Sequence, residues 1–217
     1  MPIKSQPFSL LVTIFLIGCS TTVIDEYREN PSTSMLEGES IVVLGRRNNS
    51  SYETEFDFIK CVGRSLDNSL RGINIIPEQL FLDNMYPYFE TSKAPMDVQN
   101  LAALVTIPEV AQKLYDYRLR YFIWIDGFTE TTERTGGLSC AAIPTAAACF
   151  GYASWDDEAT YEAIIWDFKD VNLAGKISAQ SSGTSYLPAV IVPIPLLAQV
   201  QSNACNKMGS QIKAFLK

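Results

Sequence analysis

The sequence predicts an α/β protein of the α+β kind, with a mixed β-sheet of about five strands and helices packed on it, including the first and last helices of the domain. Three observations predict this fold. Short β-branched apolar runs such as SIVVL and YFIWI are typical of buried strands. In the first half of the chain, these runs alternate with segments whose apolar residues recur every three or four positions. The later strands follow one another directly, and such an order gives a mixed sheet.

The expected strands are short apolar runs that stop at turn residues. SIVVL ends at the turn GRRNN, INII ends at Pro77, and YFIWI is the strongest strand signal of the chain. Two later runs flank the turn at residues 170–174 and are predicted to form a hairpin. The expected strands span residues 40–44, 73–76, 121–125, 160–169 and 175–182, and residues 128–134 either continue the third strand or turn away from it.

The expected helices follow from apolar periodicity and end signals. Phe56, Ile59 and Val62 recur at three-residue spacing, and Gly72 follows as a stop signal. Pro108 stands where a new helix can begin. The final segment carries Cys205, Met208, Ile212 and Phe215 on one face, which closes the domain as a helix. The expected helices span residues 54–70, 77–86, 98–105, 109–117 and 196–216.

Composition limits the classes of function. The chain has 217 residues, of which 47% are apolar or aromatic and 19% are charged, which predicts one globular domain. Its 17 basic residues are outnumbered by 24 acidic ones and form no basic stripe, so we expect no nucleic-acid partner. Histidine is absent, which excludes the Ser-His-Asp and Cys-His nucleophiles and His-ligated zinc. No catalytic residue and no cofactor is predicted.

The amino terminus has the features of an export signal. In residues 1–18, Lys4 precedes an apolar run from Phe8 to Ile17 that is short for a permanent membrane span. The tetrad LIGC, which ends at Cys19, resembles the lipobox of bacterial lipoproteins. That resemblance implies cleavage of the signal peptide before Cys19 and acylation of its thiol, with palmitate as one acyl group. The alternative is an ordinary cleaved signal followed by an incidental cysteine.

The resemblance to lipoproteins also implies a location. Ser20, where an aspartate would favour the inner membrane, implies an outer-membrane lipoprotein whose domain faces the periplasm. Residues 19–39 are polar, contain Pro31 and Gly38 and lack apolar periodicity, so they are expected to form a flexible tether. Residues 40–217 then form a single α/β domain.

Five segments of that domain resemble one group of envelope proteins. They are SIVVL, EFDFIKCVGRSL, GINIIP, RYFIWIDG and YEAIIWDFKDVNLAGKIS. Their order is similar to that in the α/β domain shared by the curli-secretion lipoprotein, the lipoprotein activators of penicillin-binding proteins and the amino-terminal domain of the Tol-system propeller protein. The resemblance covers residues 40–217 in the order of elements and implies an accessory role in an assembly of the cell envelope.

Four cysteines remain after Cys19, an even number that favours disulfide bonds in an exported chain. Cys140 and Cys149 flank AAIPTAAA, so we expect them to pair across a loop. Cys61 and Cys205 would then join the first helix to the last. An objection to this second pairing is that Cys61 lies about 160° from the centre of the apolar face of its helix, when each residue turns the helix by 100°. A metal site is the alternative, but no pair has CxxC spacing and none is predicted.

Two uncharged segments are candidates for interaction surfaces. Residues 136–155 are expected to form a loop pinned by the disulfide, either a partner-binding flap with Phe150, Tyr152 and Trp155 as anchors or a cover over the sheet. Residues 186–200 contain three prolines, which exclude a transmembrane helix. They are expected to be an extended packing segment or part of an exposed groove.

Charged residues suggest two further sites. Asp156, Asp157 and Glu158 lie near Glu130 and Glu133 on an expected neighbouring strand, and facing carboxylates can hydrolyse a glycan without histidine. A calcium site and a solvated turn are the alternatives. Arg46 and Arg47 follow the first strand, where open α/β sheets bind ligands. They are expected to form a surface turn or to contact an anionic partner.

The sequence therefore leads to one main hypothesis and two others. The first is a non-catalytic accessory or scaffold protein, anchored to the membrane by lipid and bound to an envelope protein. The second is a carboxylate-dependent hydrolase or binder of cell-wall glycan. The third, a membrane-inserting secretion component, predicts ring-like oligomers in detergent.

Overall fold

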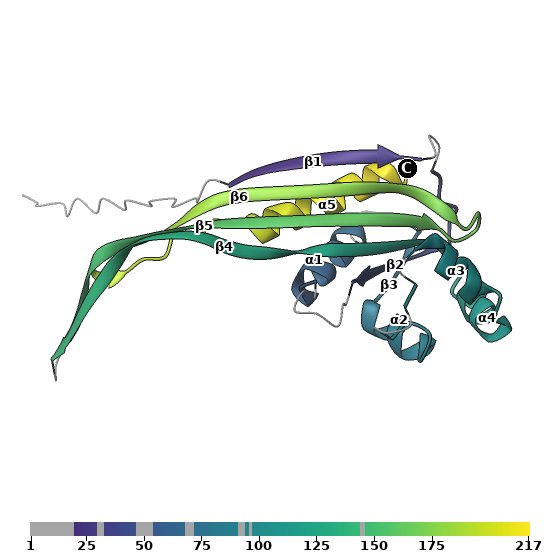
Figure 1. Ribbon diagram of the computed structural model, residues 1–217, viewed down its shortest axis with the longest axis horizontal. Coiled ribbons are helices and arrows are strands. Elements are labelled where there is room, and N and C mark those ends of the chain that lie inside the picture. Colours follow the sequence, from purple (N-terminus) through teal and green to yellow (C-terminus); the bar gives the residue numbers. More distant parts are fainter. Residues whose placement is uncertain are drawn as a thin grey trace, which may run out of the picture.

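The computed structural model describes residues 20–29, 33–46, 54–67, 72–90, 94–95, 97–143 and 146–217. These residues form one mixed sheet with helices packed on it, which confirms the predicted fold class with one strand more than expected (Figure 1). The strands are β1 (Ser20–Arg28), β2 (Ser40–Gly45), β3 (Asn74–Ile76), β4 (Leu119–Ile143), β5 (Ala146–Asp167) and β6 (Asn172–Pro193). The helices are α1 (Phe56–Asp67), α2 (Glu78–Met85), α3 (Val98–Val105), α4 (Pro108–Asp116) and α5 (Val200–Phe215).

The sheet has the order β1-β6-β5-β4-β2-β3. Strand β2 is parallel to both of its neighbours, whereas the pairs β4–β5, β5–β6 and β1–β6 are antiparallel. All six residues of β2 are buried, because helices cover both faces of the sheet at this point. This explains why SIVVL is a continuous apolar run and does not alternate.

The two faces of the sheet bury separate cores. On one face, α1 and α5 cover Ile41, Tyr121 and Ile177. On the other face, α2, α3 and α4 cover Val42 and Phe122. Neighbouring residues of a strand point to opposite faces, so β2 and β4 contribute to both cores.

The first and last helices are covalently joined. Cys61 of α1 and Cys205 of α5 form a disulfide with their Cα atoms 6.3 Å apart, which is the pairing expected from the sequence. Three residues before Cys61 in α1, the ring of Phe58 stacks on Tyr161 with centroids 3.5 Å apart. The Tyr161 hydroxyl donates a hydrogen bond of 2.7 Å to Glu55 Oε2, and burial raises the pKa of this phenol. Helix α1 is thus fixed to both α5 and the sheet.

The expected tether is wrong over residues 20–28, which form the edge strand β1. It pairs with β6 from Ser20↔Gly183 to Arg28↔Gly175. Apolar alternation is faint because Ile24 is the one apolar side chain of β1 that packs against the α1–α5 core. The strand is held instead by its backbone pairing with β6 and by a contact to α5, in which Arg28 Nη1 donates a hydrogen bond of 3.1 Å to the carbonyl of Phe215. Cys19 and the signal at residues 1–18 lie outside the described residues.

The expected loop at residues 136–155 is also wrong. Residues 136–143 and 146–155 belong to β4 and β5, which stay paired until Ile143↔Ala146. Their many alanine and glycine residues have low strand propensity, so these strands could not be predicted from the sequence. They become strands because they continue two strands that are anchored in the core, with one register shift between Thr131 and Arg134. Residues 128–134 accordingly continue β4, and β6 extends well past the expected end at residue 182.

Candidate functional site

Beyond the helices, the sheet continues as three strands that we call the arm. The arm comprises residues 132–143 of β4, 146–156 of β5 and 184–193 of β6. Figure 1 shows these strands leaving the helices behind and curving away from the body of the domain. The third strand supports the hairpin as far as the pair Cys149↔Ile191.

Two glycines and a bulge allow the arm to bend. Gly136 and Gly151 have φ of +82° and +138°, and a Cβ at these positions would lie 2.2 Å from Tyr152 O and 2.3 Å from Gly137 O, respectively. Any other residue would collide with the facing backbone. Between Thr131 and Arg134 the register of β4 against β5 shifts, which is the mark of a β-bulge.

A disulfide fixes the end of the arm. Cys140 and Cys149 are direct partners across β4 and β5 and are bonded, with their Cα atoms 4.0 Å apart. This is the second pairing expected from the sequence. The bond lies where β6 stops supporting the hairpin, so it holds the outermost residues in one register.

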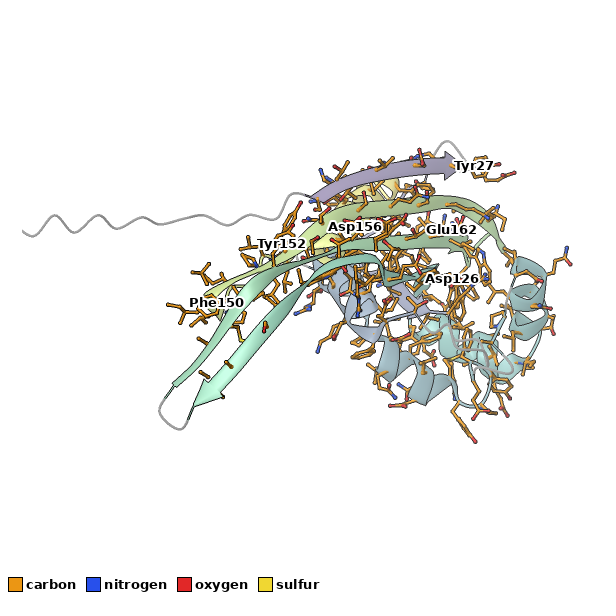
Figure 2. The ribbon with its side chains drawn as sticks, turned by 60° about the vertical axis from the view of Figure 1, so that its left-hand side comes forward. Tyr27, Asp126, Phe150, Tyr152, Asp156 and Glu162 are labelled. Atoms are coloured by element: carbon orange, nitrogen blue, oxygen red, sulfur yellow. A yellow bond between two sulfur atoms is a disulfide. The ribbon has the colours of Figure 1, made fainter. Side chains whose placement is uncertain are left out.

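The arm exposes a group of large apolar side chains, which we call the arm patch. Phe150 and Val190 are direct cross-strand partners, and the rings of Tyr152 and Tyr186 lie 6.1 Å apart. Figure 2 shows Phe150 and Tyr152 on the arm, away from the helices. The patch consists of Phe150 (56% exposed), Tyr152 (47%), Tyr186 (38%) and Val190 (78%), which share one face by strand pairing and alternation. Ile191 (58%), the partner of Cys149, lies on the opposite face, and Val192 (64%), Ile194 (53%) and Leu197 (54%) are exposed near and beyond the end of β6. Grouped exposed apolar side chains are a common feature of interaction sites.

The structure separates the residues predicted as anchors. Phe150 and Tyr152 share one face of β5, whereas Trp155 is half-buried and points to the other face by strand alternation. Arg46 lies at the end of β2, where its N–H donates to Ile125 O at 2.8 Å. Arg47 lies outside the described residues. Val190 to Leu197 lie in the segment 186–200, for which the sequence left open an extended packing segment or part of an exposed groove, and five of their apolar side chains are exposed.

The carboxylates predicted as a cluster are spread over both faces of the sheet. Asp156 accepts a hydrogen bond of 2.6 Å from Thr184 Oγ1. Its neighbour Asp157 accepts one of 2.7 Å from Thr131 Oγ1 on the opposite face. Glu130 and Glu158 are direct partners across β4 and β5, and both are exposed. Glu133 lies in the bulge and is exposed. Strand pairing therefore brings together Glu130 and Glu158.

Sequence reasoning missed how residues 194–198 are fastened to the arm. Leu196 and Tyr186 exchange two backbone hydrogen bonds of 2.8 Å, so the chain returns along the edge of β6. The buried hydroxyl of Ser185 accepts a hydrogen bond of 2.9 Å from Ala198 N and donates one of 2.5 Å to Asp157 Oδ2. The prolines that break this run fit an edge segment, because such positions need no backbone donor.

Within the described ranges, no group of three or more His, Cys, Asp or Glu side chains is placed to hold a metal ion. In the same part of the chain, no helix combines the length and the apolar character needed to cross a membrane.

The sequence matches no protein-family model and no curated protein. Among solved structures, it is similar to the PelC dodecamer from Paraburkholderia phytofirmans, with 8% identity and a TM-score of 0.40 over 90% of this chain and 98% of that chain. It is also similar to a homolog of a neuraminyllactose-binding hemagglutinin from Helicobacter pylori, with 10% identity and a TM-score of 0.40 over 88% of this chain and 92% of that chain. Superpositions this loose carry no inference about function or assembly.

Proposed function

We propose that the protein is a lipid-anchored accessory or scaffold subunit of an envelope assembly and that the arm patch binds its protein partner. The observation that carries this proposal is the arm patch itself, an apolar surface on a projecting sheet. The lipobox-like tetrad ending at Cys19 supports the lipid anchor and the outer-membrane location. The sequence resemblance to envelope accessory lipoproteins supports the role.

The chemistry of the arm patch suits a protein interface. Aromatic residues such as Phe150, Tyr152 and Tyr186 are enriched in the cores of protein interfaces, where charged residues are depleted. Burying apolar area contributes roughly 25 cal/mol per Å² before the costs of association are subtracted.

The paired strands of the arm also lower the entropy cost of ordering a binding segment. Binding a flexible loop requires that its backbone be ordered, which reduces affinity. The arm strands are paired on both sides of β5, and the Cys140–Cys149 disulfide fixes the outer end. The patch is therefore presented in a preorganised form.

Site-specific photocrosslinking tests the proposal. The photoreactive residue p-benzoylphenylalanine replaces Phe150 in the full-length chain in intact cells, and crosslinked products are identified by mass spectrometry. Tyr115 of α4 is the matched control site, an aromatic residue that is 75% exposed and lies outside the arm. We expect one envelope protein to be captured from position 150 and not from position 115. Equal capture at the two sites, or none at position 150, would refute binding through the arm.

Two further variants separate anchoring from binding. Cys19→Ala removes the acylated thiol, so capture at position 150 is expected to fall as the protein leaves the membrane. Val190→Asp places a charge in the arm patch and is expected to abolish capture while the protein stays in the membrane fraction. A Cys19→Ala protein that remains in that fraction would refute the lipid anchor.

A carboxylate-dependent glycan hydrolase or binder is the second candidate. The observation that favours it is the direct pairing of the exposed Glu130 and Glu158. Two carboxylates on one face are the minimum set for acid–base hydrolysis of a sugar. Release of reducing sugar from purified peptidoglycan by the wild type, abolished in Glu130→Gln and Glu158→Gln, would support it. No release by the wild type would exclude the hydrolase.

A further inference from the structure

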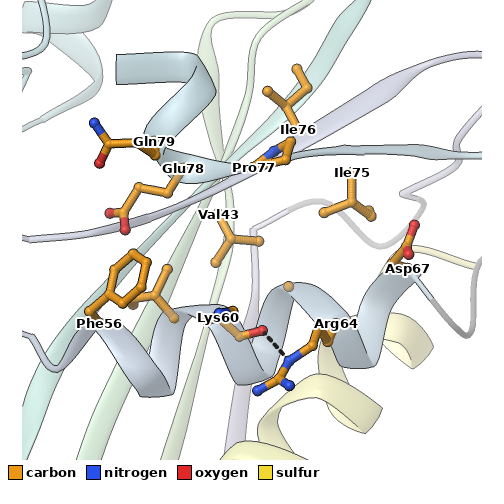
Figure 3. Close-up of a pocket in the computed structure, with 12 residues that line it drawn as sticks. Val43, Phe56, Lys60, Arg64, Asp67, Ile75, Ile76, Pro77, Glu78 and Gln79 are labelled. Carbon is orange, nitrogen blue, oxygen red and sulfur yellow. Dashed lines mark hydrogen bonds between the residues drawn. The ribbon is translucent and has the colours of Figure 1, made fainter. Parts of the chain in front are cut away.

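A groove separate from the arm lies between helix α1 and the segment that leads from β3 into α2 (Figure 3). Its volume is about 330 Å³, which falls within the range of small-ligand pockets. Its apolar walls come from the sheet, from α1 and from Pro77. The lining residues are Val43, Phe56, Ile59, Lys60, Gly63, Arg64, Asp67, Ile75, Ile76, Pro77, Glu78 and Gln79.

A glycine in the middle of α1 keeps this groove open. A Cβ built on Gly63 meets no atom within 4 Å, so no close packing requires a glycine here. Glycine in a helix interior costs up to about 1 kcal/mol relative to alanine. Any longer side chain at this position, which lines the groove, would take up part of its space.

The charges along the mouth of the groove are unequal. Lys60 and Arg64 lie one turn apart on α1, both exposed, and neither forms an ion pair within the described residues. Arg64 Nε donates to Lys60 O at 3.3 Å, as Figure 3 shows. Glu78 is buried in the wall and accepts a hydrogen bond of 2.8 Å from Gly45 N. Asp67, at the end of α1, is the one exposed acidic residue of the lining.

The sheet edge beside the groove suits a small molecule better than a peptide strand. The edge strand β3 has three residues and is followed by Pro77, which has no N–H to donate. An added strand would find too few partners for a ladder of hydrogen bonds. An apolar chain needs no such partners.

We propose that this groove binds a single-chain anionic amphiphile of the fatty-acid class. Its apolar chain lies over Gly63 between Ile59 and Ile75, and its carboxylate lies at Lys60 and Arg64. The apolar walls provide the burial of the chain, and the two cations provide charge-assisted hydrogen bonds to the head group. This site is independent of the arm and of the proposed partner.

Isothermal titration calorimetry with sodium dodecanoate below its micelle concentration tests the chain-binding part. We expect saturable one-to-one binding to the wild type and about tenfold or greater loss of affinity in Gly63→Phe, which fills the groove. Gly63→Ala, which leaves most of the volume, is the matched control and is expected to bind within about twofold of the wild type. No binding by the wild type up to about 1 mM would overturn the proposal.

Binding of the head group is tested by separate variants. They also keep the proposal testable if Gly63→Phe fails to fold. Lys60→Gln with Arg64→Gln changes two exposed side chains and is expected to lower the affinity for dodecanoate by about tenfold. Dodecyltrimethylammonium, with the same chain and a positive head, is expected to bind the wild type at least tenfold more weakly than dodecanoate. Equal affinity for the two probes, or unchanged affinity in the double variant, would overturn the assignment of an anionic ligand.

Discussion

Ser185 donates a hydrogen bond of 2.5 Å to Asp157 Oδ2 while its own oxygen accepts one of 2.9 Å from Ala198 N. This relay joins β5, β6 and the segment that leads into α5 at the base of the arm. The hydroxyl of Ser185 is buried, so its removal leaves the Ala198 N–H without its acceptor.

Ser185→Ala is therefore expected to release residues 194–198 from the edge of β6. The loss should be about 1–3 kcal/mol in the free energy of unfolding, the usual cost of an unsatisfied buried donor. Hydrogen–deuterium exchange checks this through faster exchange at Ala198. Ser182→Ala, a change at an exposed serine of the same strand, is the control and should leave that exchange unchanged.

Replacing two arm-patch residues is expected to change surface properties and not stability. In the double variant Phe150→Ser with Val190→Ser, the urea midpoint should give a free energy of unfolding within about 0.5 kcal/mol of the wild type, because both side chains are largely exposed. Retention on a hydrophobic-interaction column should fall. A large loss of stability would mean that the patch packs within the molecule.

The Cys61–Cys205 disulfide is expected to stabilise the whole domain, and the Cys140–Cys149 disulfide mainly the end of the arm. Closing the 144-residue separation of Cys61 and Cys205 stabilises by about 5 kcal/mol in the chain-entropy model, and closing the 9-residue separation of Cys140 and Cys149 by about 2–3 kcal/mol. Cys61→Ser with Cys205→Ser should therefore lower the global melting temperature strongly. Cys140→Ser with Cys149→Ser should mainly speed exchange at the arm end. A larger drop in melting temperature for the second pair would contradict this.

Asp167 is expected to give stability a local pH dependence. Its carboxylate pairs with Arg120 Nη2 at 2.7 Å and accepts from Lys169 N at 2.9 Å, yet burial raises its pKa above the ordinary 3.8. The folded state then binds this proton more tightly than the unfolded state. The contribution of Asp167 is thus complete below pH 3.8 and declines as the pH rises through the raised folded pKa.

Urea titrations of the wild type and Asp167→Asn between about pH 3 and pH 7 test this linkage. The stability of the wild type minus that of the variant should decrease as the pH rises through the window just above 3.8. A difference that grows with pH would mean that the Arg120 ion pair outweighs burial.

The body of the domain could be predicted from the sequence because its signals are local. Helix α1 begins at Phe56 and ends at Asp67, inside the predicted range 54–70, since one stripe of its residues packs on the sheet. The buried strand β2 matches the run SIVVL to within one residue. In both elements the apolar residues of the sequence are the residues that pack in the core, so the apolar pattern predicts the element.

The arm could not be predicted because its structure depends on distant pairing. Residues such as Gly137 and Ala148 have no preference for strands, and their partners are set by pairing that starts in the core at Tyr121↔Asp167 and shifts by one residue at the bulge after Thr131. The pairing of Cys140 with Cys149 was accessible from spacing alone. The sequence indicated the arm patch in part, through Phe150 and Tyr152 and through the alternative that residues 186–200 form part of an exposed groove. It could not show that these side chains share one exposed face, because that depends on the pairing of β5 with β6.

The two disulfides are nested, with Cys140–Cys149 enclosed by Cys61–Cys205 in the chain. Because synthesis proceeds from the amino terminus, Cys61 and Cys140 both emerge before Cys205, so pairing in order of emergence would give the wrong bond. Correct oxidation of Cys61 must wait for the final helix or be corrected by thiol–disulfide exchange. Maturation of this protein thus depends on the order of oxidation as well as on an oxidising environment.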